Sequence, residues 1–320
     1  MSDYAYEDLI PEEVASSVIE AVRHESAVLS LGRSVIIPKG VLKLPVVSFA
    51  PQAGFISAHG GRKPITRIEW TVEQITPEEI AAVLAIPADF LGDSGFPVWE
   101  NVQPAVASAL AYALDMAVLW GDGAPAAFPA DGVAGFAGEV VEGETTLLAV
   151  SEAMAKVEDT GLIPTGHATG PGSGRFLRNL KDENGNLVYL AGITAGAPAT
   201  LYDLPVSKTL AWPTAGGASV GEGDLITGDW TKLVLGVRED IRFTLSTDGV
   251  LTDDDGIVVA NAFQDDLVLM RCYMRVGAAI GQPVNVKNET TEPFAICSLT
   301  PTGGEGVIGI AAKPKAKAKA

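Results

Sequence analysis

The strongest pattern in the sequence is a long helix over residues 97–120, rich in alanine and leucine. Pro97 suits an early helical position, and Asp93 or Ser94 can cap the helix. We expect it to end at Gly121-Asp122-Gly123, and about 22 residues at about 1.5 Å each predict a rod of about 33 Å. A face of small residues that suits close packing is formed by Val102, Val106, Ala109, Ala113 and Ala117.

Two apolar stretches on either side of a polar, glycine-rich segment predict a long two-stranded ribbon. Residues 34–50 predict two short strands, and Ile68, Trp70 and Val72 fall on one face of a strand over residues 65–74. Between them, residues 51–64 show little apolar patterning and include a basic Gly-Gly-Arg-Lys sequence. An isolated two-stranded ribbon is marginal in water, so this one must lie on another surface, which favours a role between subunits.

The rest of the chain predicts a mixture of helices and short strands, which places the fold in the α+β class. Helices are expected over residues 146–159 and 175–182, and residues 124–145 are expected to be loop and turn. Near the N-terminus, residues 11–22 predict a helix with an apolar stripe that includes Val14 and Val18. Short strands are expected at 204–206, 224–229, 232–237, 240–246, 267–276 and 294–299.

The chain is strongly acidic, with a net charge of −18. The four lysines of the C-terminal tail contribute +4, so the rest of the chain carries −22. Such a charge repels nucleic acid, which suits a wall that encloses DNA without binding it, although solubility is the commoner reason for an acidic chain and the two are compatible. No stretch of about 18 apolar residues predicts a membrane span, and the N-terminus does not have the pattern of a signal peptide.

No motif predicts a catalytic, cofactor or metal site. His24, His59 and His167 are scattered singly, and Cys272 and Cys297 lie in apolar stretches where we expect them to be buried. The glycine-rich residues 170–174 lack the Lys-Ser/Thr of a phosphate-binding loop. Residues 252–256, Thr-Asp-Asp-Asp-Gly, lack the later acidic ligand of a calcium loop and predict an acidic surface turn.

The order and spacing of these elements resemble the HK97-type major capsid proteins of tailed bacteriophages, over about residues 15–300. Four stretches carry the resemblance. The first runs from the ribbon ending in Ile68-Glu69-Trp70 through residues 86–94 to the helix ending at 115–123. The second is residues 175–182 with the Gly185 turn, and the third is residues 201–206. The fourth comprises residues 228–240, residues 266–277 and a closing strand.

The resemblance implies an HK97-like capsid fold with a defined division of the chain. The expected parts are an N-arm (1–43), an extended E-loop (44–75), a peripheral domain (76–161) with the spine helix 97–120, an axial domain (162–238), strands returning to the peripheral domain (239–305) and a disordered Lys/Ala tail (306–320).

The resemblance also implies a structural protein rather than an enzyme. Copies of the chain would form pentamers and hexamers of an icosahedral shell around double-stranded DNA, located in the virion after assembly in the host cytoplasm. Expected partners are other copies, a portal, a decoration protein and a separate scaffolding protein, because little sequence precedes the arm. Residues expected at intersubunit contacts are His59, Arg62, Lys63, Arg67 and Trp70 of the ribbon and Val14 and Val18 of the N-terminal helix.

Three alternatives stay open at this point. An encapsulin-like compartment has the same fold but encloses an enzyme, and the acidic charge does not separate it from a capsid. A soluble β-rich enzyme would need a cluster of polar residues converging in a pocket, and no such cluster can be named. Lys63 suggests an isopeptide crosslink of the kind some capsid proteins form, but no motif identifies the asparagine or glutamate that it needs, and a solvated or salt-bridging lysine is the favoured interpretation.

Overall fold

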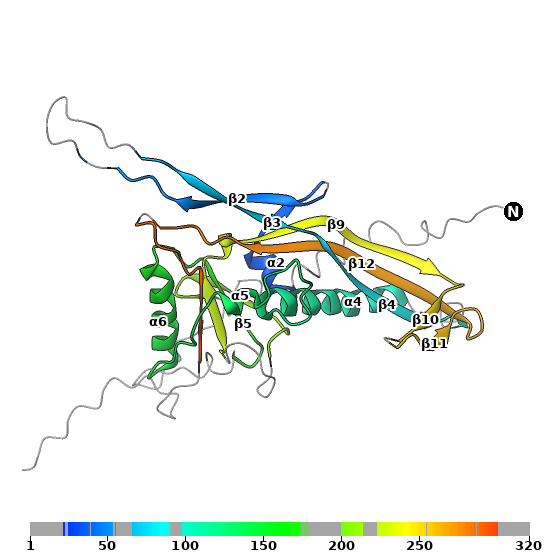
Figure 1. Ribbon diagram of the computed structural model, residues 1–320. Coiled ribbons are helices and arrows are strands. Elements are labelled where there is room, and N and C mark those ends of the chain that lie inside the picture. Colours follow the sequence, from blue (N-terminus) through cyan, green and yellow to red (C-terminus); the bar gives the residue numbers. More distant parts are fainter. Residues whose placement is uncertain are drawn as a thin grey trace, which may run out of the picture.

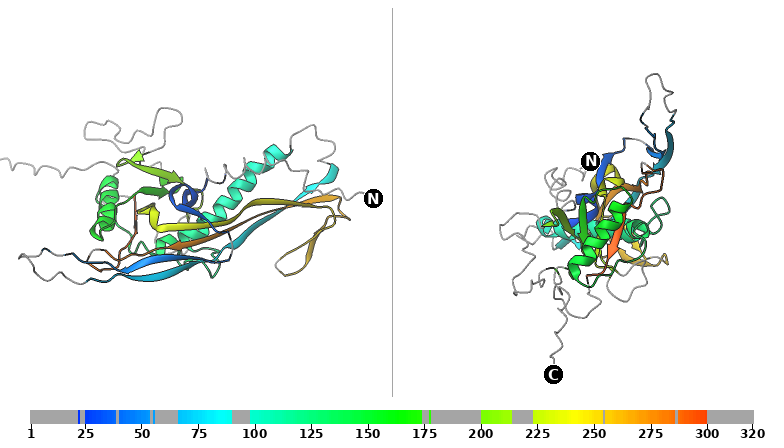
Figure 2. Two further views of the ribbon diagram at one scale, coloured as in Figure 1. Left: turned by 90° about the horizontal axis from the view of Figure 1, so that it is seen from above. Right: turned by 90° about the vertical axis from the view of Figure 1, so that its left-hand side faces the viewer.

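The computed structural model describes residues 22, 25–38, 40–53, 55, 66–89, 98–173, 177, 200–213, 223–253, 255–285 and 287–299. The described chain is elongated, with a β-ribbon leaving the body at one end and a small β-hairpin at the other (Figure 1). Views from two further sides show the same arrangement (Figure 2). The predicted helices over residues 11–22 and 175–182 lie outside the described residues, except for Val22 and Leu177, and so does the tail 306–320.

The predicted long helix is confirmed as α4 (Val98–Asp115), which continues into a turn of π-helix, η2 (Met116–Trp120). Gly121 ends it in the left-handed conformation, with φ of 72°. The expected small-residue face is wrong in part, because Ala109 and Ala113 are exposed. The buried stripe lies beside it on the helix surface and consists of Val106, Ala107, Leu110, Ala111, Leu114, Ala117 and Val118.

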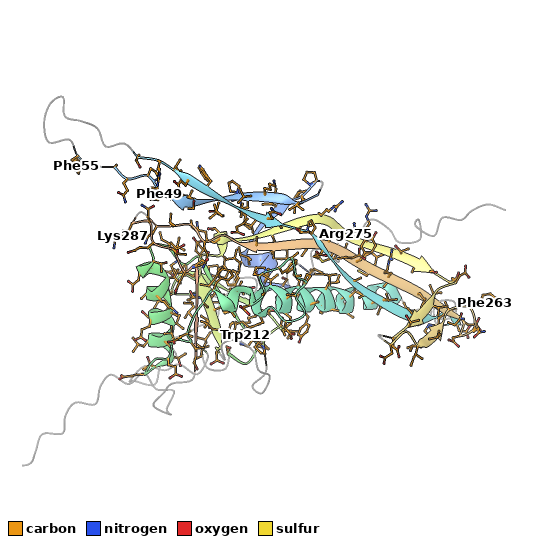
Figure 3. The ribbon with its side chains drawn as sticks, viewed as in Figure 1. Phe49, Phe55, Trp212, Phe263, Arg275 and Lys287 are labelled. Carbon is orange, nitrogen blue, oxygen red and sulfur yellow. The ribbon has the colours of Figure 1, made fainter. Side chains whose placement is uncertain are left out.

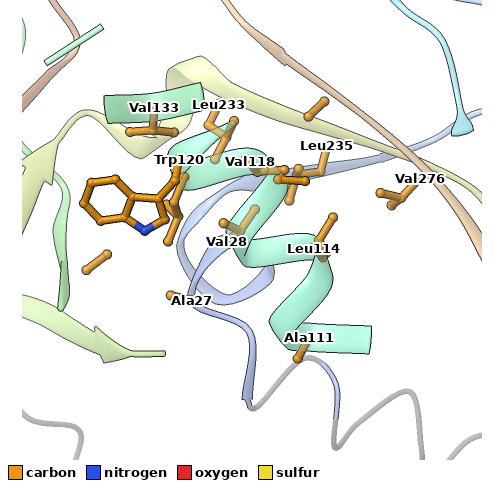
Figure 4. Packing of buried hydrophobic residues seen from close by; sticks show 14 of the residues in the cluster. Ala27, Val28, Ala111, Leu114, Val118, Trp120, Val133, Leu233, Leu235 and Val276 are labelled. Carbon is orange, nitrogen blue, oxygen red and sulfur yellow. The ribbon is translucent and has the colours of Figure 1, made fainter. Parts of the chain in front are cut away.

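This helix packs against one face of a four-stranded sheet with the order β1-β9-β12-β4. Strand β1 (Arg33–Ile36) is parallel to β9 (Leu233–Ser246), and β12 (Leu267–Ile280) is antiparallel to both β9 and β4 (Glu78–Pro87). The strands predicted at 232–237 and 240–246 are a single strand, because irregularities in its pairing with β12 absorb the polar break between them. Leu114 and Val118 meet Leu235 and Val276 in the core between the helix and the sheet (Figure 4).

A five-stranded sheet with the order β13-β8-β5-β7-β6 forms the second part of the fold. Its strands are β5 (Gly166–Thr169), β6 (Thr200–Leu201), β7 (Leu204–Lys208), β8 (Leu225–Gly228) and β13 (Phe294–Cys297). Helix α6 (Thr146–Asp159), predicted with these bounds, packs against β8 and β13 and begins where the Thr145 side chain accepts a hydrogen bond from Leu148 N. The two Cys residues are buried and free, as predicted, and burial raises the pKa of each thiol to about 12.

Strand β5, which the glycine-rich sequence did not predict, is the central strand of this sheet. All four of its residues are buried. Nε2 of His167 lies 3.2 Å from the carbonyl oxygen of Leu201, and burial lowers the pKa of the imidazole to about 4. His167 is therefore a neutral core residue at pH 7.

Short elements complete the described chain. The region predicted as loop at 124–145 contains one four-residue helix, α5 (Gly132–Gly135), and a 3-10 turn, η3 (Trp230–Lys232), leads into β9. The hairpin at the far end consists of β10 (Val250–Thr252) and β11 (Val258–Asn261). Asp253 and Asp255 lie exposed between its strands, which confirms the predicted acidic surface turn.

A buried carboxylate joins the N-terminal segment to the end of α4. Asp115 accepts hydrogen bonds from the Ser26 hydroxyl and from Ala27 N at 2.9 Å, at the start of helix α2 (Ala27–Leu31). Burial raises the pKa of this carboxyl, and the hydrogen bonds oppose that rise. Ser26 is itself the N-cap of the short helix, and the long helix adds a second acceptor there, which fixes the path of the chain into β1.

We expect Asp115→Ala to lower the free energy of unfolding by about 1–3 kcal/mol, because buried donors lose their acceptor. Asp115→Asn keeps one acceptor oxygen and should cost less. Urea unfolding measures both, with the exposed Asp122→Ala as the control, which should stay within about 0.5 kcal/mol of the parent. If Asp115→Ala were as stable as that control, the hydrogen bonds to Asp115 would contribute nothing to the fold.

Candidate assembly interface

The predicted ribbon is confirmed as the antiparallel pair β2 (Leu42–Phe49) and β3 (Glu69–Ile75). Its root packs on the sheet face opposite α4, where Ile37 and Ile75 are buried with Val234 and Ala279. Two glycines that pair across β9 and β12, Gly236 and Gly277, make this approach possible. A Cβ atom on Gly277 would stand 2.7 Å from Ile75 Cγ2, and one on Gly236 would meet Ile37, so larger residues would push the ribbon off the sheet.

Beyond this root a cleft lies between part of the ribbon and its own body. This cleft of about 400 Å³ has Val46, Thr71 and Glu73 on the ribbon side and Phe128 and Phe136 on the body side. The ribbon is held by its root and by two hydrogen bonds farther along β2, from Val284 N to the carbonyl oxygen of Val47 and from Ala50 N to Oδ1 of Asn288.

The outer face of the ribbon carries an apolar stripe. In the register of the two strands, Val47 pairs with Trp70 and Pro45 pairs with Val72, so all four side chains share one face. Trp70 is 56% exposed and Val72 is 50% exposed. We call Pro45, Val47, Trp70 and Val72 the ribbon stripe, a set of apolar side chains that a ribbon in isolation leaves in water.

Charged and aromatic side chains continue this surface toward the ribbon tip. The Arg67 guanidinium lies 5.5 Å from the centre of the Phe49 ring and forms an ion pair of 3.1 Å with Glu69. Phe55 is fully exposed, farther along the same strand direction (Figure 3). Aromatic and arginine side chains of this kind are enriched where proteins bind one another.

The structure places two of the predicted contact residues on this surface, Arg67 and Trp70. The other five, His59, Arg62, Lys63, Val14 and Val18, lie outside the described residues. Sequence reasoning did not identify Pro45 and Val47 as partners of Trp70, because only the register between the strands brings them together.

Over the described residues, no three side chains of His, Cys, Asp and Glu gather in a way that could hold a metal ion. None of the helices in the same part of the chain combines the length and apolar character that a membrane crossing needs.

Comparison with known proteins decides the family. The model of the phage capsid family matches residues 7–287, which is most of the chain. The chain belongs to the phage capsid family. Its relatives include the major capsid protein of Klebsiella oxytoca phage phiKO2, 25% identical over 280 residues, and that of Staphylococcus phage 80alpha, 22% identical over 273 residues.

The alignments cover 82% and 84% of this chain. They cover 63% of the length of the phiKO2 protein and 80% of that of the 80alpha protein. A solved chain from Microbacterium phage Oxtober96 is 27% identical, with a TM-score of 0.68, and the match covers 86% of this chain and 91% of that one. The fold is the HK97-like capsid fold that the order of elements predicted.

Exposure of the ribbon stripe leads to a prediction about stability. Trp70→Ala should lower the free energy of unfolding of the unassembled chain by no more than about 1 kcal/mol, the value of a cross-strand pair. The matched variant Trp230→Ala removes an indole that is 1% exposed and bonded to Gly166 O, and it should cost about 3–5 kcal/mol. Urea unfolding compares the two, and equal losses would mean that Trp70 belongs to the core.

Proposed function

We propose that this chain is a structural shell subunit, the major capsid protein of a tailed bacteriophage, without catalytic activity. The observation that carries the proposal is the ribbon stripe, an exposed apolar surface on an element that its own chain supports at the root and through two hydrogen bonds along β2. Membership of the phage capsid family and the name of both relatives, major capsid protein, support the same conclusion.

In the proposed shell, copies of the chain associate as pentamers and hexamers, and the ribbon of each lies on a neighbour. Contact through Trp70, Val72 and Arg67 would remove the stripe from water. A stable pair of proteins buries roughly 1,600 Å² in total, and one face of a ribbon offers only part of that. Each copy therefore needs several contacts, of which the ribbon is one.

The division into domains stays a prediction, and we propose one refinement of it. The four-stranded sheet with α4 would be the peripheral domain, with α4 and η2 as its spine helix. The five-stranded sheet would be the axial domain, and it would take α6 and β13 in addition to residues of the range 162–238. The N-arm and the tip of the E-loop would fall on residues 1–43 and 51–64.

Partners and location follow from the same proposal. The shell would enclose double-stranded DNA without sequence-specific binding, since the net charge of −18 opposes contact with phosphates. Assembly in the host cytoplasm would involve a portal, a separate scaffolding protein and a decoration protein. The relatives are named major capsid proteins, which favours this function over an encapsulin-like compartment.

Negative-stain electron microscopy of the purified chain after gel filtration tests the proposal. We expect closed shells or rings of five or six subunits, formed by the chain alone or together with its scaffolding protein. Trp70→Ala should reduce the fraction of chain in these assemblies without unfolding it. A chain that stays monomeric at high concentration, even with the scaffolding protein present, would contradict the proposed function.

A further inference from the structure

The loop between β12 and β13 supports the ribbon at a second place, away from the root. We call its described residues, 283–285 and 287–292, the bridging loop. Val284 N donates to the carbonyl oxygen of Val47 at 3.1 Å, and Ala50 N donates to Asn288 Oδ1 at 2.6 Å. Ribbon residues 46–48, which line the cleft, lie between the root and Ala50. Supports on both sides of the cleft fix the direction of the ribbon, whereas the root alone would let it swing.

Hydrogen bonds within the bridging loop hold it in one shape. Asn285 Oδ1 accepts from Lys287 N at 2.9 Å and from Glu289 N at 3.0 Å. At the base of the loop, the Thr291 hydroxyl donates to the carbonyl oxygen of Pro283 at 2.6 Å. The loop therefore meets the ribbon with a backbone that its own side chains have already ordered.

The bridging loop is also fastened to the C-terminal end of α6. Asn285 Nδ2 donates to the carbonyl oxygen of Thr160 at 3.3 Å, and the Thr160 hydroxyl donates to the carbonyl oxygen of Glu292 at 3.4 Å. Lys156 of the same helix forms an ion pair of 3.9 Å with Glu292. Figure 3 shows Lys287 of the loop between the ribbon and this helix. The root thus attaches the ribbon to the four-stranded sheet, and the bridging loop attaches it to the part of the fold that contains α6.

Asn288 combines the two properties that this contact needs. Its φ of 63° lies in the left-handed region, which Asn and Asp adopt more readily than other residues that carry a side chain. Its short side chain also places an acceptor oxygen at Ala50 N. Glycine would keep the backbone conformation without the acceptor, and aspartate would keep both. The two properties can therefore be separated by substitution.

We propose that Asn288 is a positioning residue, which sets the direction of the ribbon relative to α6 and so presents the ribbon stripe for assembly. Without the Asn288 oxygen, the ribbon would be held by its root and by the bond at Val47. A ribbon that samples several directions must be ordered when it makes contact, and this ordering weakens association. The inference rests on the proposed function, because the direction matters only where the stripe meets another copy.

A distance measurement between spin labels tests the position of the ribbon directly. Gln52→Cys on the ribbon and Glu152→Cys on α6 provide two exposed attachment sites, while the native Cys272 and Cys297 are buried. Electron–electron double resonance then gives the distribution of label distances in the unassembled chain. We expect Asn288→Gly to make this distribution at least about twofold broader than in the parent, because the ribbon then populates more directions.

Matched variants separate the acceptor from the backbone conformation. Asn288→Asp keeps the oxygen and should restore the narrow distribution. Asp203→Gly removes a side chain at another left-handed position, with φ of 62° between β6 and β7, and should leave the distribution unchanged. Asn285→Ala removes the donor to Thr160 O without touching the ribbon, and it should broaden the distribution as Asn288→Gly does.

Assembly gives the second readout. In the unlabelled chain, Asn288→Gly should lower the assembled fraction about fivefold, the factor that corresponds to one hydrogen bond, and Asn288→Asp should recover it. Analytical ultracentrifugation measures this fraction. Thermal unfolding followed by circular dichroism should give the same midpoint for both variants within about 4 °C, because a positioning residue changes the ribbon and not the core.

Four results would overturn the inference. They are a narrow distance distribution in Asn288→Gly, a broad one in Asn288→Asp, parent-like assembly of a chain whose ribbon has become mobile, and a general loss of stability that accounts for the assembly defect. A narrow distribution in Asn285→Ala would overturn the link to α6. A parent chain that never assembles would instead contradict the proposed function, and the label distances would still decide whether Asn288 positions the ribbon.

Discussion

The packing of α4 and η2 against one face of the four-stranded sheet is the contact on which the rest of the structure depends. The largest buried cluster lies in this layer and joins the helix stripe to Leu235, Met274 and Val276. The helix covers only one face of the sheet. At one end, the opposite face receives the ribbon root, over Gly236 and Gly277, and at the other end it carries arginines. The molecule therefore buries one face of its sheet against its own helix and leaves part of the other face exposed.

This incomplete burial explains why the chain is elongated instead of compact. The ribbon and the hairpin extend from opposite ends of the body, and both expose apolar side chains that an independent monomer would bury (Figure 2). Exposed apolar surface is costly in water, so its concentration on two projecting elements favours association. The acidic charge works in the other direction, because it keeps copies apart unless complementary surfaces meet. Together, the exposed apolar surface and the acidic charge favour specific contacts over general aggregation.

Much of this architecture could be predicted from local patterns in the sequence. The bounds of α6, the length of the α4–η2 helix and the pairing of the ribbon were all evident from periodicity and turn residues. Strand β5 was missed, since Gly166 and His167 become strand residues only when β7 and β8 pair with them on either side. The pairing of Gly236 with Gly277 was also not predictable, because it depends on the register between strands far apart in the sequence.

The central claim is that other copies of the chain cover the surfaces that the monomer leaves exposed. Hydrogen–deuterium exchange of the unassembled and the assembled chain tests it most directly, since exchange reports protection segment by segment. Peptides covering β2–β3 and residues 247–266 should exchange more slowly after assembly, while those covering α4 should change little. Equal exchange of the ribbon and hairpin peptides in both states would contradict the account.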